Sequence, residues 1–148
     1  MITYTLEPIA SIWDECLACC QAHWLETSMY AEGQVLDLRL ERYEEHEKAR
    51  VFVTIVARDN GIFAGFCWMY LTPSMHTQEL LATEDVLYLK PEYRRGRNGY
   101  RLYQFVIDEM RRLGAKHIMV TAPPGSASDR ILATMGGTLA AHAYTKAL

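Results

Sequence analysis

Hydrophobic and polar positions change their period several times along the first half of the chain, and each change marks an expected element. Apolar residues recur every three or four positions over 11–26, which predicts a helix with Ser11 at its N-cap, and residues 36–48 give a second, more polar helix. The apolar stretches 51–58 and 62–71 have the composition of strands. Asp59-Asn60-Gly61 between them is a typical hairpin turn, so the two strands are expected to be antiparallel.

The second half of the chain alternates strands and helices. The expected elements are a strand ending at Leu89, an amphipathic helix over 100–113, a strand over 117–122, a helix from Ser126 or Ser128 to Met135, and one or two strands within 138–147. Pro91 stops the first of these strands and Gly114 ends the long helix. This order predicts one domain, 1–148, of mixed α/β class, in which 84–122 is a parallel strand–helix–strand crossover.

The composition is that of an ordinary globular chain. Half of the 148 residues are apolar and 22% are charged. No stretch approaches the ~20 apolar residues needed to cross a bilayer, and the N-terminus lacks the basic flank and apolar core of a signal peptide. We therefore expect no membrane association and a cytoplasmic location.

The cysteines favour packing over metal or redox chemistry. Cys16, Cys19 and Cys20 lie in the first helical segment and Cys67 lies in an apolar strand. A zinc site needs a second pair of ligands at suitable spacing, and none is present in the sequence. We expect four small buried thiols and no bound metal.

The net charge of −3 is unevenly distributed. Residues 90–116 carry eight basic and three acidic side chains, a net +5, so the rest of the chain carries −8. A local positive block on an acidic protein favours a confined anionic ligand. A nucleic-acid binder is more often basic over a broad face, which argues against that class.

The segment 85–102 combines the features of a phosphate-binding turn. A strand leads into a short Arg/Gly loop, Arg94–Gly99, that opens directly into a helix. The first N–H groups of a helix have no internal partners, and the helix dipole adds partial positive charge there. Glycines allow close approach and arginines add charge-assisted contacts. The P-loop pattern and the Gly-x-Gly-x-x-Gly pattern are both absent.

The same segment resembles the signature of the GNAT acetyltransferases. Leu89-Lys90-Pro91-Glu92-Tyr93-Arg94 is similar to their lead-in, and Arg94 to Gly99 is similar to Arg/Gln-x-x-Gly-x-Gly/Ala, except that Arg97 replaces the middle glycine and Gly96 stands one position earlier. Residues 131–137 resemble "Leu-Tyr-x-x-x-Gly-Phe", with Leu132 and Gly137 at the two aromatic positions. The degenerate loop is also similar to that of phage-encoded members. The resemblance covers nearly the whole chain.

This resemblance implies a GNAT fold: a mixed, mostly antiparallel sheet of about six or seven strands, splayed at its middle and flanked by about four helices. It implies acetyl-CoA as cosubstrate. The residues it assigns to CoA are Leu87 and Leu89, whose main chain would hold pantetheine, and Arg94, Arg95, Gly96, Arg97, Asn98, Gly99 and Tyr100 around the pyrophosphate. One N–H near Leu87 would polarise the thioester carbonyl, and 117–122 would form the other side of the gap.

Acetyl transfer to an amine needs a base for the ammonium proton and an acid for the departing thiolate. Glu84 and Asp85 lie where some GNAT relatives place a catalytic carboxylate, and strand alternation puts them on opposite faces; Glu84 is slightly preferred, and a water chain is an alternative base. Tyr144 and Ser128 are candidate acids. Structural roles are open for all of them, as they are for the candidate acceptor walls, His23, Trp24, Met29, Tyr30 and Trp68.

Three function classes remain at this point. The first is an N-acetyltransferase that acts on a small-molecule or protein amine, to which the acidic remainder of the chain would be attractive. The second is a catalytically weak GNAT scaffold that binds CoA or a partner, suggested by Arg97 and Leu132 at motif positions. The third and least favoured is a nucleic-acid binder. A homodimer is compatible with a terminal strand that pairs between copies.

Overall fold

The computed structural model describes residues 1–27 and 34–141. Its elements are, in order, β1 (Ile2–Leu6), α1 (Ile9–Glu26), α2 (Leu40–Lys48), β2 (Phe52–Asp59), β3 (Ile62–Pro73), β4 (Leu80–Leu89), the 3-10 turn η1 (Pro91–Tyr93), α3 (Asn98–Arg112), β5 (His117–Met119) and α4 (Ala127–Thr134). None of the helices within these ranges is long and apolar enough to cross a membrane.

The strands form one mixed sheet in the order β1-β2-β3-β4-β5. The pairs β1–β2, β2–β3 and β3–β4 are antiparallel, and β4–β5 is parallel. The β2–β3 hairpin and the parallel crossover from β4 to β5 are the pairings that the sequence predicts. Within the described ranges the sheet has five strands, fewer than the six or seven expected. Residues 138–141 have no regular secondary structure and 142–148 lie outside the described residues, while β1 is a strand that the sequence analysis did not identify.

The β2–β3 hairpin turns through two residues, as its sequence predicts. Asp59 pairs with Ile62, which leaves Asn60 and Gly61 as the loop, with φ angles of 50° and 85°. Two consecutive positive φ angles are the backbone of a type I′ turn, whose twist matches that of the flanking strands. The turn therefore sets the pairing of β2 with β3 next to the loop.

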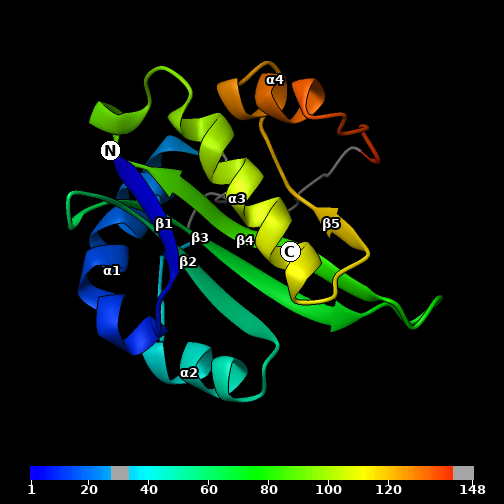
Figure 1. Cartoon of the computed structure of the whole chain (residues 1–148). Coiled ribbons are helices and arrows are strands. Elements are labelled where there is room, and N and C mark those ends of the chain that lie inside the picture. The colour runs from blue at the N-terminus through cyan, green and yellow to red at the C-terminus, as the bar shows by residue number, and fades with distance from the viewer. Residues whose placement is uncertain (28–33, 142–148) are drawn as a thin grey trace.

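Helices lie on both faces of the sheet (Figure 1), and each face has its own apolar core. On one face, Ile12 and Cys16 of α1 and Tyr43 of α2 pack against Phe66 and Trp68. On the other face, α3 packs the buried residues Leu102, Val106 and Met110 against the strands. All four cysteines are buried and free, as expected, and burial raises the pKa of each thiol.

Two helix starts differ from the sequence-based expectation. α1 begins at Ile9, its N-cap is Pro8, and the Ser11 hydroxyl donates to the Pro8 carbonyl instead of capping the helix. The completely buried Ile9 explains the earlier start, because helical backbone here brings it into the core. α2 begins at Leu40 and not at Leu36; the residues before it are extended, and alternate leucines still reach the core.

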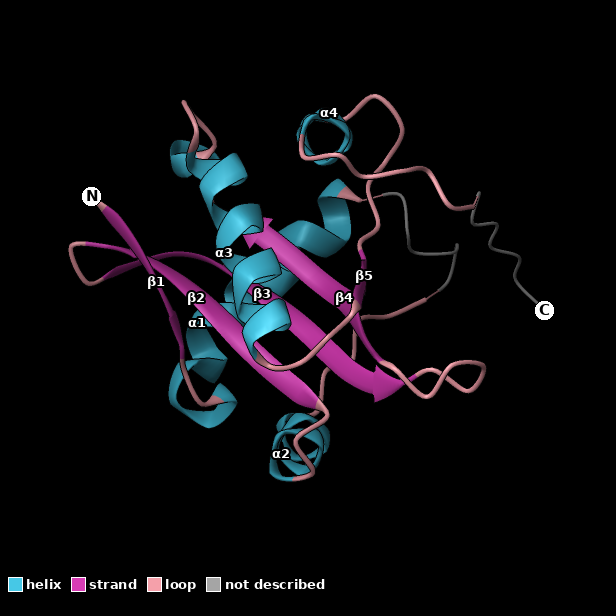
Figure 2. Cartoon of the chain, turned by 45° about the vertical axis from the view of Figure 1, so that its right-hand side comes forward, coloured by secondary structure: helices cyan, strands magenta, loops and turns pink. Residues whose placement is uncertain are grey.

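The parallel pair β4–β5 separates soon after it forms. β5 pairs with β4 only over Leu81–Thr83, whereas β4 continues to Leu89. Figure 2 shows the chain after β5 leaving the sheet toward α4 while β4 runs on beside α3. The expected splay in the sheet is therefore present, and it opens at Glu84 and the residues after it.

Candidate functional site: the gap between β4 and β5 and the loop before α3

The loop between β4 and α3 has the backbone that its shifted glycine suggests. Gly96 has φ +60°, a left-handed conformation that glycine adopts without strain. Arg97 is the N-cap of α3 and has φ −105°, which any residue adopts. The loop therefore needs its glycine at 96 and tolerates arginine at 97, the position where the GNAT motif has its own glycine.

The start of α3 presents main-chain donors that no carbonyl satisfies. Across residues 1–27 and 34–141, the N–H groups of Gly99 and Tyr100 have no backbone partner, and the helix has no side-chain N-cap. The side-chain amide of Asn98 does not cap the helix; it donates a hydrogen bond to the Tyr93 carbonyl. Arg95, Gly96 and Arg97 are exposed, so side chains do not plug the turn. This is the arrangement that binds an anionic oxygen at a helix N-terminus.

Gly99 has a packing role. A Cβ atom placed on Gly99 would lie 3.1 Å from Cδ1 of Ile131 on α4. That is a tight contact, although it involves the end of a flexible side chain. Glycine here lets α4 sit close to the first turn of α3, so α4 forms one side of the site.

Arg94 is turned away from these donors and holds the loop in place. Its Nε donates to the Leu89 carbonyl at 2.6 Å, and its Nη2 lies 2.8 Å from a Glu26 carboxylate oxygen at the end of α1. Its guanidinium also lies over the Tyr88 ring, 4.9 Å from the centroid. The other nearby cations are in a different situation: within the described ranges, Arg95, Arg97 and Arg101 make no ion pair.

Glu84 spans the opening between β4 and β5. Its Oε2 accepts hydrogen bonds from the Thr121 N–H at 3.0 Å and from the Thr121 hydroxyl at 3.1 Å. The Leu87 N–H also points at this carboxyl group and favours its ionised form. Burial opposes these donors and is the larger effect, so the pKa of Glu84 is raised above its usual value.

Asp85 lies on the opposite face of the sheet from Glu84. Trp68 pairs with Val86 and Met69 with Glu84, so Asp85 is the unpaired residue of a β-bulge. Its charge raises the pKa of Tyr43 and of Tyr70, which places it on the α1/α2 face of the sheet. The side chain is exposed, yet the protein around it displaces enough water to raise the pKa of Asp85 itself.

Tyr103 of α3 lies on the same side of the sheet as Glu84. It is 2% exposed, and burial raises its pKa to about 12, with the Ser128 side chain acting in the opposite direction. The phenol is therefore neutral at physiological pH. The Glu84 charge also raises this pKa, which indicates that β4, α3 and α4 bring polar groups together beside the opening.

The remaining predicted site residues are distributed unevenly. Leu87 and Leu89 lie on the stretch of β4 beyond its pairing with β5, as pantetheine binding would need. His23 has its ring edge on Tyr88. Tyr144, Met29 and Tyr30 lie outside the described residues. Trp68 is completely buried and belongs to the core, not to an acceptor wall.

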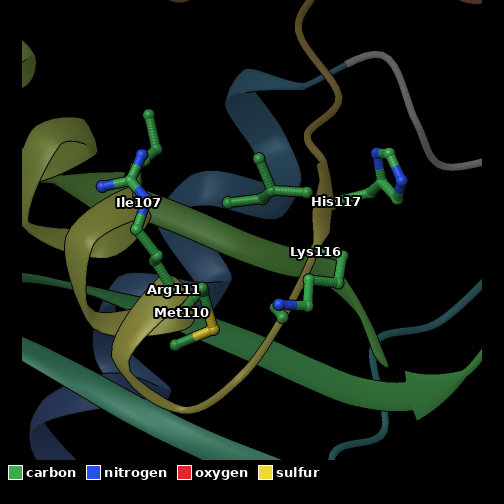
Figure 3. A pocket seen from close by; sticks show the side chains of 7 residues that line it. Ile107, Met110, Arg111, Lys116 and His117 are labelled. Atoms are coloured by element: carbon green, nitrogen blue, oxygen red, sulfur yellow. The ribbon is translucent and has the colours of Figure 1, made fainter. Parts of the chain in front are cut away.

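Two cavities lie away from the loop and carry none of its residues. A small one of about 80 Å³ lies between α3 and β5 and is lined by residues that include Ile107, Met110 and Arg111 of α3 and Lys116 and His117 around the start of β5 (Figure 3). A wider, open one of about 490 Å³ is lined by Asp37, Arg39, Glu41 and Arg42. In the part of the chain described, no group of His, Cys, Asp and Glu is arranged to hold a metal ion.

The sequence analysis missed Thr121 and Glu26 as members of this region. Thr121 lies in the segment expected to border the gap, but nothing in its neighbours marks its hydroxyl as a ligand of Glu84. Glu26 is separated from Arg94 by 68 positions, and both are exposed charged residues of ordinary type. Only the fold brings either pair together.

Comparison with known proteins agrees with this geometry. The profile of the acetyltransferase (GNAT) family matches residues 9–136. No curated protein sequence matches the chain.

Solved structures share the fold at low sequence identity. A ribosomal-protein-alanine N-acetyltransferase from Brucella melitensis biovar Abortus 2308 superposes with a TM-score of 0.73 at 15% identity, covering 99% of this chain and 98% of the other. An aminoglycoside acetyltransferase from an uncultured soil metagenomic sample, in complex with sisomicin, gives 0.72 at 14%, covering 99% and 97%. A predicted acetyltransferase from Clostridium acetobutylicum, with acetyl-CoA, gives 0.74 at 10%, covering 99% and 96%.

Proposed function

The chain belongs to the GNAT acetyltransferase family, and from this premise we propose that it transfers an acetyl group from acetyl-CoA to a primary amine. The proposal is supported most directly by the loop before α3. There, the N–H groups of Gly99 and Tyr100, which have no backbone partner within 1–27 and 34–141, lie beside exposed arginines at a helix N-terminus. These donors suit a pyrophosphate, because anions are stabilised by the helix dipole and by charge-assisted hydrogen bonds.

The donor residues divide into two kinds. Gly99, Tyr100 and the flexible cations Arg95 and Arg97 are proposed to contact the phosphates. Arg94 is proposed to act indirectly, since its guanidinium is already bonded to Leu89 and Glu26. Asn98 likewise supports the loop through its bond to Tyr93. Leu87 and Leu89 are proposed to bind pantetheine with their main-chain groups, beyond the point where β5 leaves β4.

We assign the general base to Asp85. Its side chain is exposed and lies on the side of the sheet where α1 and α2 pack. The raised pKa of Asp85 is suited to accepting a proton. Glu84 has its carboxylate engaged by Thr121, which leaves it less able to reach an amine. The negative charge of Asp85 would also attract a cationic acceptor.

The reaction follows from these positions. The ammonium group gives a proton to Asp85, directly or through water, and the neutral nitrogen attacks the thioester carbonyl carbon. A main-chain N–H of β4 stabilises the negative charge that develops on the carbonyl oxygen. The carbon–sulfur bond then breaks, the attacking nitrogen releases its second proton to water so that the neutral amide forms, and the CoA thiolate takes up a proton. Tyr144 remains a proposal for the group that supplies it.

The test is turnover on a panel of acceptors. The protein is incubated with acetyl-CoA and one amine at a time while the release of free thiol is followed. The panel of amines includes sisomicin and, separately, a peptide with an N-terminal alanine. The expected result is amine-dependent thiol release that Asp85→Asn lowers at least tenfold with CoA affinity preserved. CoA binding without release on any amine would support the scaffold alternative. No CoA binding would overturn the proposal.

A further inference from the structure

The opening of the sheet carries a cluster of hydrogen-bond donors that the proposed reaction does not yet use. Thr121 supplies two of them, its N–H and its hydroxyl, and both converge on one oxygen of Glu84 at 3.0 and 3.1 Å. The Leu87 N–H reaches the same carboxyl group from β4. Donors from both edges of the gap therefore act on one carboxyl group, and the two from Thr121 share one of its oxygens.

This position lies where an acyl donor would have to pass. Leu87 is on the stretch of β4 beyond its last pair with β5, and Thr121 is two residues after the end of β5. An acyl chain lying between these edges reaches the Glu84 carboxylate at the inner end of the gap, because Glu84 directly follows Thr83, the last paired residue of β4. The carboxylate therefore closes the gap at its apex.

Two donors on one oxygen, with a third acting on the same carboxyl group, suit a partly negative acceptor better than a water molecule or a methyl group. A carboxylate oxygen and the carbonyl oxygen of an amide or thioester have the same needs here, since each accepts two or more hydrogen bonds. These hydrogen bonds stabilise the Glu84 carboxylate. The carboxylate is charged, however, and removing its charge from water costs free energy that opposes the gain. A neutral carbonyl can accept the same bonds without that cost.

The geometry points to Thr121, together with the Leu87 N–H, as the binding site for a carbonyl oxygen of the acyl donor, with the Glu84 carboxylate as its intramolecular competitor. The inference rests on the proposed function and extends it in two ways. It gives Thr121 a ligand-binding role, and it makes Glu84 a residue that limits donor affinity, not the base. The carbonyl belongs either to the thioester or to a pantetheine amide.

The test measures dissociation constants for acetyl-CoA and for CoA by calorimetry on the full chain. Glu84→Ala removes the competitor, so acetyl-CoA should bind about three- to tenfold tighter, the range expected for one hydrogen-bonding competitor. Glu84→Gln keeps an acceptor oxygen and should fall between Ala and wild type. If only acetyl-CoA gains, the oxygen is that of the thioester; if CoA gains equally, it is that of a pantetheine amide.

Asp85→Asn is the matched control for charge. It removes the same negative charge one position away on the opposite face, so it should leave both dissociation constants within about twofold of wild type. Thr121→Val is made in the Glu84→Ala background, because in wild type it weakens both competitors at once. There it should weaken acetyl-CoA binding about threefold or more. Thermal unfolding of each variant checks that it folds.

The outcomes separate the two proposals. If wild type binds acetyl-CoA and Glu84→Ala binds it no tighter than Asp85→Asn does, Glu84 is a structural clasp and the competitor assignment is wrong. An unchanged affinity in Glu84→Ala/Thr121→Val, relative to Glu84→Ala, removes the Thr121 hydroxyl from the site. If wild type binds neither acetyl-CoA nor CoA, the proposed function itself fails, and this inference with it.

Discussion

The Arg94 guanidinium lies 2.8 Å from the Glu26 carboxylate and so joins the loop before α3 to the end of α1. The two side chains are 39% and 42% exposed, which makes this a surface ion pair. Its value to global stability is therefore small, of the order of 1 kcal/mol or less. Its geometric value is larger, because the same guanidinium holds the Leu89 carbonyl and covers the Tyr88 ring.

Removing either partner should loosen CoA binding to different degrees. Arg94→Ala loses the Leu89 and Tyr88 contacts together with the ion pair, so we expect an increase in the CoA dissociation constant of about tenfold. Glu26→Gln loses only the charge of the pair, and about twofold is expected. Calorimetry measures both. A larger effect from Glu26→Gln would show that the ion pair, and not the bond to Leu89, holds the loop.

Direct phosphate contacts should be lost when the two exposed loop cations are removed. The double variant Arg95→Ala/Arg97→Ala is expected to raise the CoA dissociation constant tenfold or more, and the loss should shrink at high salt. Arg111→Ala/Arg112→Ala removes the same charge at the far end of α3, where the arginines pair with Asp108 and Glu109. It should bind CoA as wild type does. An equal loss of CoA affinity in the two double variants would indicate that the overall positive charge, and not a phosphate site at the loop, attracts CoA.

Gly65 is predicted to be intolerant of any side chain. A Cβ there would lie 2.3 Å from the Tyr88 carbonyl oxygen, which is main chain and cannot move without breaking the β3–β4 pairing. We expect Gly65→Ala to lower the free energy of unfolding by about 2 kcal/mol or more. Gly99→Ala is the comparison: its Cβ meets only the tip of Ile131, and alanine favours helix, so a change within about 1 kcal/mol is expected. Chemical denaturation measures both.

The raised pKa of Asp85 should appear in the pH dependence of stability. The folded protein holds this proton more tightly than the unfolded chain, so stability from this group is present below the ordinary aspartate pKa and is lost as pH rises through the folded pKa. Relative to wild type, Asp85→Asn should therefore gain stability as pH rises from about 4 to 7. Denaturation curves at several pH values test this. A difference that stays constant with pH would contradict burial as the cause.

Local sequence was sufficient where neighbouring residues alone decide the conformation. Asn60-Gly61 predicted its hairpin because only residues that tolerate positive φ can make that turn. Ser126 was one of the two predicted caps of α4, and the Asp129 N–H does donate to its hydroxyl. The three- and four-residue spacing of α3 identified the face that packs on the sheet. The strand 2–6 was missed and residues 36–39 were wrongly predicted as helix, because each segment is too short to carry a distinctive pattern.

The sequence by itself determined the order of the elements from α1 to α4, the amphipathic helix, and the Arg/Gly turn before it that we propose binds phosphate, since each depends on residues close together in the chain. Only the tertiary structure decided which partner each charged side chain of the site meets. It turned Arg94 toward Glu26, placed Glu84 on Thr121, and put Asp85 in a bulge on the other face. These partners are 37 or more positions apart or depend on the register with β3, and no local pattern encodes which long-range neighbour a charged side chain meets.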